Sequence, residues 1–229
     1  MRRTTLSILL ACLFVLPLSH VRAGSIPVSI SAKGGVGTAN FAMDGINDQL
    51  SLLRQTYGGN SSTLDGGFNV YLEGRIWMFG RFAALVGFEH YWAETDLTTP
   101  SDSYIFKAPT NVLLLGGAVT VFQFPKLVDI NLGARGSFAK VTFGTNEIDV
   151  SGTLDEYKNN SYGWDIFAEV NANFLRPVEV GIMLGYRNLT IDGLEDKFGE
   201  IAYHVDSGKE VELDYSGTFI YITAGFRLW

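Results

Sequence analysis

The sequence predicts an all-β protein in which eight antiparallel strands close into a transmembrane up-and-down barrel. Three observations lead to this prediction. Apolar and polar residues alternate with a period of two in seven segments, which is typical of strands with two different faces. The connections between the segments alternate between short and long, and the chain begins with an export segment.

Residues 1–23 have the features of a secretory signal peptide. Two arginines precede an apolar run from Leu6 to Leu18, and Val21-x-Ala23 fits a small-residue cleavage site. The run is too short for a spanning helix, which needs about 20 apolar residues. We expect cleavage after Ala23, which leaves residues 24–229 as one outer-membrane β-barrel domain.

The only cysteine, Cys12, lies inside this segment. Leu9-Leu10-Ala11-Cys12 is loosely similar to a lipoprotein cleavage box, but the apolar stretch before Cys12 is very short and continues past it. The sequence therefore favours ordinary cleavage over lipidation. The mature chain then has no cysteine, which excludes disulfides, thiol catalysis and cysteine-ligated metal.

The mature chain is acidic. Removal of Arg2, Arg3 and Arg22 lowers the 17 basic residues to 14, against 24 acidic residues, so the net charge is −10. An acidic exported chain without a basic patch is a poor nucleic-acid binder. Asp44 and Asp48 lack the dense oxygen-ligand spacing of a calcium loop. We therefore expect no nucleic-acid partner, no metal and no cofactor.

Each strand is predicted from its own alternation. The apolar sets are, in chain order, Ile26-Val28-Ile30-Ala32, Phe68-Val70-Leu72-Ile76, Phe82-Ala84-Val86-Phe88, Val128-Ile130-Leu132-Ala134-Phe138, Ile166-Ala168-Val170-Ala172-Phe174, Val178-Val180-Ile182-Leu184-Tyr186 and Ile220-Ile222-Ala224-Phe226-Leu228. Phe167 and Met183 are exceptions among the polar sets. Residues 110–122 form the eighth strand, but both of its faces are apolar, so its orientation stays open.

Short and long connections are sorted to opposite ends. Three short ones lie near 78–81, 123–127 and 175–178, and four long ones cover roughly 34–67, 93–109, 144–161 and 189–214. This asymmetry is typical of bacterial outer-membrane barrels, whose short turns face the periplasm. Residues 189–214 contain a hairpin signal at Asp206-Ser207-Gly208, so ten strands are the alternative.

Aromatic residues gather near both ends of the predicted strands and suggest two interfacial girdles. They are Phe79, Phe124, Phe174 and Trp229 at the short-turn end, and Trp92, Tyr104, Phe106, Phe143, Trp164 and Tyr215 at the long-loop end.

A volume argument assigns the faces. An eight-stranded barrel has room for side chains or one small ligand, so the bulky apolar sets must face lipid and the smaller, charged sets the interior. The residues predicted to face lipid are Val70, Val86, Ile130, Val170, Ile182, Leu184, Ile220 and Ile222. The predicted interior charge network is Glu73, Arg75, Glu89, Asp129, Arg135, Asp165, Glu169, Glu179, Arg187 and Arg227. Opposite charges in a confined interior should pair; either a rigid plug or a narrow polar channel fits this set.

The C-terminal sequence "YITAGFRLW" resembles the closing strand of small outer-membrane barrels of the OmpA, OmpX and OmpW kind, which ends in an aromatic-Arg-Phe tripeptide. Phe226-Arg227-Leu228 occupies that position here, followed by one extra residue, Trp229. The resemblance implies that Phe226, Leu228 and Trp229 form the signal that the barrel-assembly machinery reads. It implies an architecture and no functional subfamily.

Residues 43–57 follow helical spacing, with Ile46, Leu50, Leu53 and Tyr57 on one face and Asp44 as a candidate N-cap. Such a helix would lie on the membrane surface, cover the barrel mouth or pack on its own loop. His90 is predicted on the apolar face near the rim, a position that resembles the His-Ser pair of outer-membrane lipid A deacylases, but no serine accompanies it. We name no catalytic set.

The sequence thus predicts a monomeric, non-enzymatic outer-membrane protein with a structural, surface-binding or weakly pore-forming role. Its expected partners are membrane lipid and, during biogenesis, the assembly machinery. One alternative is a transporter of small hydrophobic molecules, because Val112, Leu114 and Ala118 could line the lumen. A lipid-modifying enzyme is the other alternative.

Overall fold

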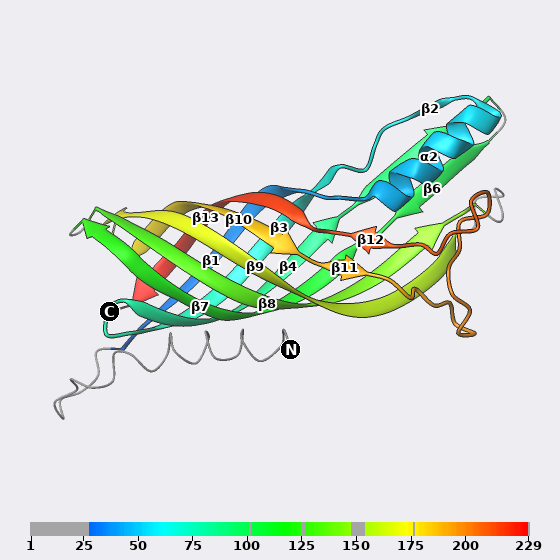
Figure 1. The fold of residues 1–229 in the computed structure, drawn as a ribbon. Helices are drawn as coiled ribbons and strands as arrows, with labels where there is room; N and C mark the ends of the chain where they lie inside the picture. Colours follow the sequence, from blue (N-terminus) through cyan, green and yellow to red (C-terminus); the bar gives the residue numbers. More distant parts are fainter. Residues whose placement is uncertain (1–27, 101, 125–126, 148–153, 176, 229) are drawn as a thin grey trace, which may run out of the picture.

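Eight long strands close into an antiparallel barrel (Figure 1). The computed structural model describes residues 28–100, 102–124, 127–147, 154–175 and 177–228. The barrel strands are β1 (Val28–Asn40), β3 (Gly66–Met78), β4 (Phe82–Trp92), β7 (Thr110–Phe124), β8 (Val128–Thr145), β9 (Asp155–Leu175), β10 (Val178–Asn188) and β13 (Gly217–Leu228). Each pairs with its neighbours in this order, and β1 pairs with β13 to close the ring. The eight-stranded prediction is confirmed and the ten-stranded alternative is wrong.

The residues that carry the signal peptide, its cleavage site and Cys12 lie outside the described residues, as do Ile26 and Trp229. The expectations placed on them therefore stay predictions. In the part of the chain that the structure describes, no helix combines the length and the apolar character needed to cross a membrane.

Strand register sets the stagger of the barrel. The cross-strand row that starts at Ile130 on β8 passes through Val170, Ile182, Ile222, Val36, Val70, His90 and Asn111. It returns to β8 at Lys140, ten residues beyond Ile130. A stagger of ten over eight strands tilts the strands by roughly 40° from the barrel axis, within the usual range for barrels.

The strand faces follow the predicted alternation. Six of the residues predicted to face lipid are exposed on the outer face, and Val70 and Ile130 are half-buried there. The structure also orients β7: Val112, Leu114 and Ala118 face inward, while Leu113 and Leu115 face outward. The sequence left this orientation open because large apolar residues occupy both faces of the strand.

The two large side chains that interrupted the polar pattern, Phe167 and Met183, are buried inside the barrel. Glycine makes room for the phenylalanine: Gly133 and Gly185 are the direct cross-strand neighbours of Phe167. A Cβ on Gly133 would lie only 2.2 Å from the Phe167 ring. The Phe167 ring thus fills the space that the missing side chain of Gly133 leaves, whereas the space at Gly185 is filled by the Phe219 ring.

Several strands extend well past the predicted segments at the long-loop end. β8 continues to Thr145 and β9 begins at Asp155, so this pair projects beyond the rest of the ring. The loop after β4 folds into a hairpin of β5 (Glu94–Thr98) and β6 (Ser103–Lys107), and β6 joins β8. Short strands β2 (Asn60–Ser61), β11 (Thr190–Ile191) and β12 (Leu213–Asp214) complete the loops. The hairpin expected in 189–214 therefore lies outside the ring.

Helix α2 (Asp44–Tyr57) matches the predicted helix and lies beside β6 (Figure 1). Its N-cap is Met43, without a side-chain cap, so Asp44 is the first helical residue and the predicted cap is wrong. Ile46, Leu50 and Leu53 bury the apolar face of the helix. The helix contacts its own loop through Asn47 and Asp65, and the other long loops through Gln49 with Glu147 and Tyr57 with Tyr104.

The aromatic girdle at the long-loop end is only partly as predicted. Trp92 and Trp164 are exposed on the outer face, but Tyr104, Phe106, Phe143 and Tyr215 are buried. These four belong to the hydrophobic core, which continues from the barrel interior into the long loops, because the strands and hairpins extend far enough to enclose them. The aromatic residues that do accompany the two tryptophans on the outer face are Phe68, Phe88, Phe138, Tyr162 and Tyr186.

Candidate functional site

The structure places all ten residues of the predicted interior charge network on the inner face of the barrel. Lys33 on β1 joins them as an eleventh member. None of the eleven exposes more than 4% of its surface. The alternation in β1 already put Lys33 on the polar face; what the sequence could not show is that its side chain reaches across to β9.

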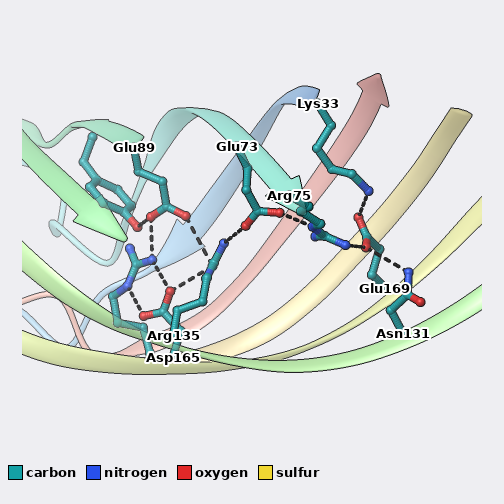
Figure 2. A network of polar contacts seen from close by, with 10 residues as sticks. Lys33, Glu73, Arg75, Glu89, Asn131, Arg135, Asp165 and Glu169 are labelled. Carbon is teal, nitrogen blue, oxygen red and sulfur yellow. Dashed lines mark hydrogen bonds and ion pairs between the residues drawn. The ribbon is translucent and has the colours of Figure 1, made fainter. Parts of the chain in front are cut away.

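Glu169 is the centre of one half of the network (Figure 2). Lys33 Nζ lies 2.6 Å from one of its carboxylate oxygens, and Arg75 Nη1 donates to the other at 2.6 Å. The Asn131 amide donates to the second oxygen at 3.3 Å. Lys33 also lies 3.3 Å from Glu179, so two carboxylates share this buried ammonium group.

Arg135 is the centre of the other half (Figure 2). Its guanidinium lies 3.5 Å from Glu73, 3.4 Å from Glu89 and 2.8 Å from Asp165. Arg187 contacts the same two carboxylates from the loop side, at 2.5 Å from Glu89 and 2.8 Å from Asp165.

Glu73 joins the two halves, because it also accepts a hydrogen bond from Arg75. The contacts therefore run without a break along the lumen, from Lys33 to Arg187. The Tyr91 hydroxyl donates to Glu89 and adds a polar contact at the loop-side end.

A smaller cluster occupies the short-turn end. Asp129 accepts hydrogen bonds from Asn173 at 2.7 Å and Arg227 at 3.3 Å. The Arg227 guanidinium also lies over the Trp77 ring, 4.3 Å from its centroid. This cation–π contact helps to hold a positive charge in a confined interior.

The interior contains five cations and six carboxylates, so its charges nearly cancel. Aromatic rings fill the space between them: Arg135 lies 4.9 Å from the Phe167 centroid and Arg187 lies 4.9 Å from the Tyr91 centroid. Within the described residues, no group of three or more His, Cys, Asp or Glu side chains is arranged to hold a metal ion. The arrangement is that of a packed, paired electrostatic core.

One wall of the interior is apolar. Ala83 and Leu85 on β4 lie next to Val112, Leu114 and Ala118 on β7, and all five side chains are buried. The charged residues are supplied mainly by the other strands. This division could not be foreseen from β7 alone, because the direction in which β7 faces depends on its register with β4.

Three aromatic side chains close the barrel where the loops begin, and we refer to Phe41, Tyr91 and Tyr215 as the aromatic lid. Phe41 makes edge contacts with Tyr91 at 5.8 Å and with Tyr215 at 5.1 Å between ring centroids. The Tyr215 hydroxyl donates to the Ala108 carbonyl at 2.6 Å, which ties the lid to the loop before β7.

Above the lid, the long loops form a compact unit that we call the loop domain, comprising 41–65, 93–109, the ends of β8 and β9, and 189–216. Gln49 of α2 donates to Glu147 at 2.6 Å, and His204 Nδ1 lies 3.2 Å from the same carboxylate. Tyr57 stacks on Tyr104 with 5.9 Å between centroids. Burial raises the pKa of Tyr104 above its usual value. These contacts connect loops from all parts of the chain.

The remaining predicted positions lie on the outer face. Phe226 and Leu228 of the expected assembly signal are exposed there, while Arg227 between them points inward. His90 Nδ1 lies 2.9 Å from Asn111 Oδ1, so its polar neighbour is an amide and not a serine. The catalytic pair considered for this position is absent from the described residues around His90.

Comparison with known proteins adds information on the fold. No protein-family model and no curated protein matches the sequence. The crystal structure of Ail, the attachment invasion locus protein of Yersinia pestis, in complex with the heparin analogue sucrose octasulfate, has a TM-score of 0.50 and 11% identity, covering 88% of this chain and 99% of that chain.

Two further outer-membrane structures have lower scores. The outer membrane protein OprG from Pseudomonas aeruginosa has a TM-score of 0.47 and 12% identity, covering 90% of this chain and 98% of that chain. Neisserial surface protein A has a TM-score of 0.41 and 14% identity, covering 90% and 99%. At such identities a similarity extends to the fold and not to what these proteins bind. With its closed ring of eight antiparallel strands, this chain has the fold of the small outer-membrane β-barrels.

Proposed function

We propose that the protein is a non-enzymatic outer-membrane barrel with a closed lumen, which anchors the loop domain at the cell surface. The observation that carries this proposal is the unbroken series of ion pairs from Lys33 to Arg187, covered by the aromatic lid. Moving an ion along this lumen would require breaking ion pairs between buried charges, which is very costly.

Three features support the location. The outer face of the strands is apolar around the ring, which suits contact with lipid. The long loops lie at one end and the short turns at the other, as in bacterial outer-membrane barrels. The predicted signal peptide supplies the route of export.

The charge of the loops suggests what kind of partner they would contact. Segments 41–65, 93–109, 146–154 and 189–216 contain 16 acidic and 4 basic residues. Phe198, Tyr203 and Val205 add exposed apolar side chains to the last segment. Such a surface fits a cationic, partly apolar partner through charge complementarity.

The same charge argues against transferring the ligand of the Yersinia pestis structure to this chain. Sucrose octasulfate is a polyanion, and acidic loops would repel it. Calorimetric titration of the refolded protein with sucrose octasulfate should therefore give no binding heat. Saturable binding at micromolar concentration would contradict the proposed partner chemistry.

Single-channel recording in a planar bilayer tests the closed lumen. Correctly inserted protein, verified by heat-modifiable gel migration, should give no conductance steps. Steady steps that change in size in Glu169→Gln or Arg187→Gln would mean an open polar channel and would overturn the proposal. Both residues lie in the lumen, so a change in step size would place the ion path there.

A second function deserves a test because of the apolar wall formed by Leu85, Val112 and Leu114. Small hydrophobic molecules could use such a wall if the side chains opposite moved aside. Vesicles containing the protein should take up a fluorescent hydrophobic solute no faster than protein-free vesicles if the lumen is closed. Faster uptake that Leu114→Asp abolishes would favour transport.

A further inference from the structure

A short polar row interrupts the apolar outer face of the barrel near its loop end. It contains His90 on β4, Asn111 on β7, Lys140 on β8 and Asn160 on β9, which are direct cross-strand partners in this order. All four side chains point outward. The pairing therefore lines up four polar side chains on one patch of the outer surface, and we call this patch the polar row.

The residues immediately below the polar row fix its depth. Two residues closer to the short-turn end, the same four strands present Phe88, Leu113, Phe138 and Tyr162, which are again cross-strand partners. Phe138 and Tyr162 contact each other with 5.2 Å between centroids. Amphipathic aromatic rings mark the membrane interface in such barrels. Because the strands are tilted, each member of the polar row from His90 to Asn160 lies roughly 3 Å farther toward the loop end than the one before it. The row therefore leaves the apolar belt near His90 and enters the level of lipid headgroups at Lys140.

Lys140 is distinctive among the charges of the outer face. On the outward positions of the described barrel strands, the charged residues are Lys140, Glu156 and Lys158, and the last two pair with each other at 3.3 Å. Among the described residues, Lys140 has no acidic partner. Its unpaired ammonium group contrasts with the acidic loops above it and favours an anion at this particular depth.

The neighbours of Lys140 supply further hydrogen-bond donors. The Asn111 Oδ1 atom lies 2.9 Å from His90 Nδ1, so the contact with His90 does not use the amide NH₂ group of Asn111. His90 is itself held by an edge contact with Trp92, 4.3 Å between ring centroids. The Asn160 amide stands on the other side of Lys140. A cation flanked by two amides is suited to bind a phosphate group.

We propose that the polar row binds the phosphate group of an anionic lipid in the outer leaflet, with Lys140 as the charged contact. This inference rests on the proposed placement in the outer membrane. The acyl chains of the bound lipid would lie over Phe88, Leu113, Phe138 and Tyr162, and its phosphate would reach Lys140 and the amide of Asn111. The site differs from the loop domain in both chemistry and location.

Native mass spectrometry of the refolded, detergent-solubilised protein tests the site, with phosphorylated lipid A and dephosphorylated lipid A as probes. The wild type should retain the phosphorylated form preferentially, and Lys140→Gln should lower that binding about fivefold, the effect of one lysine near an anionic lipid surface. Lys107→Gln is the matched control, since it removes the same charge from the loop domain, where Lys107 pairs with Glu94 at 2.8 Å. It should bind like the wild type.

Equal loss in both variants, or no preference of the wild type for the phosphorylated form, would overturn the inference. Displacement of the lipid by millimolar inorganic phosphate would also overturn it, because the ligand would then be phosphate and not a lipid. Heat-modifiable migration of every variant shows that the barrel has folded. A folded barrel that gives no conductance steps and does not prefer phosphorylated lipid A would refute this inference alone. Failure of the protein to insert into bilayers would refute the proposed function.

Discussion

Glu169 and Arg135 are the two side chains on which the interior ion pairs converge. Each contacts several oppositely charged groups from other strands, and neither has access to solvent. A buried charge that loses its partner cannot regain hydration without opening the barrel. The cost of removing one of these residues is therefore set mainly by the charges it leaves behind.

Glu169→Gln should lower the free energy of unfolding by about 3–5 kcal/mol, because Lys33 and Arg75 would share one carboxylate fewer. Urea unfolding in lipid vesicles measures this change. Glu94→Gln is the control: it breaks a solvent-exposed ion pair with Lys107 and should cost less than about 1 kcal/mol. Similar losses in the two variants would mean that the interior is hydrated and not packed.

The inward positions of the charges could be derived from alternation alone, but their partners could not. Lys33 meets Glu169 because the barrel is staggered by ten residues, and the stagger depends on every strand pairing at once. The large side chain of Phe167 on the inward face is also explained by register, because the glycines beside it, Gly133 and Gly185, lie on other strands. The alternation in the sequence predicts on which face of a strand a residue lies. The register between strands determines which other residues its side chain contacts.

The sequence predicted the position and orientation of those strands that have one apolar and one polar face. It failed for β7, which is apolar on both faces, and for β1, whose glycine-rich second half from Gly34 shows no alternation. It also underestimated the length of β8 and β9, because the parts of these strands nearest the loops lie beyond the membrane region and no longer need an apolar face. Tyr104 and Phe143 were therefore expected at the membrane interface, although they form the core of the loop domain.

Helix α2 should hold the loop domain together without supporting the barrel. Leu50→Ala removes a fully enclosed side chain and should destabilise the loop domain by about 2–5 kcal/mol. Limited proteolysis should then cleave the loops while the barrel fragment keeps its heat-modifiable migration. Gln55→Ala on the exposed face of the helix is the control and should leave the loops resistant. Loss of the folded barrel in Leu50→Ala would show that the two parts are not independent.

Strand β10 allows the lipid-facing assignment to be tested at two depths of one face. Ile182→Arg should reduce stability by about 2–4 kcal/mol, because the charge would enter the middle of the bilayer. Asn188→Arg lies on the same outward face at the loop end and should cost about 0–1 kcal/mol. Equilibrium unfolding in vesicles compares the two variants, and equal costs would be incompatible with a spanning orientation.

Considered as a whole, the molecule has a distinct distribution of charge along its axis. The loop segments contain 16 acidic and 4 basic residues, whereas the sequence between β3 and β4, β7 and β8, and β9 and β10 contains Arg81, Lys126 and Arg176 and no acidic residue. The interior between them is nearly neutral. Acidic loops and basic turns give the two ends different electrostatic environments, which favours one orientation in an asymmetric membrane.

The height of the apolar belt follows from strand length and tilt. The 11 residues of β10, inclined by roughly 40°, span roughly 27 Å along the barrel axis. This height is close to the apolar band of about 25 Å in outer-membrane barrels. In vesicles of graded acyl-chain length, the melting temperature should therefore peak at a hydrocarbon thickness near 25 Å. A steady rise with chain length would contradict this geometry.

The contact between Lys33 and Glu169 also has a kinetic consequence. The two residues are 136 positions apart in the chain, and their strands are brought together only when β1 meets β13. Before that moment Lys33 lacks its contact with Glu169, so the buried charges are less completely paired, which is unfavourable. Partially assembled intermediates are therefore less stable until β1 pairs with β13. A contact between residues so far apart in the chain also forms slowly. We therefore expect the ion pair between Lys33 and Glu169 to form late in assembly, after β1 has paired with β13.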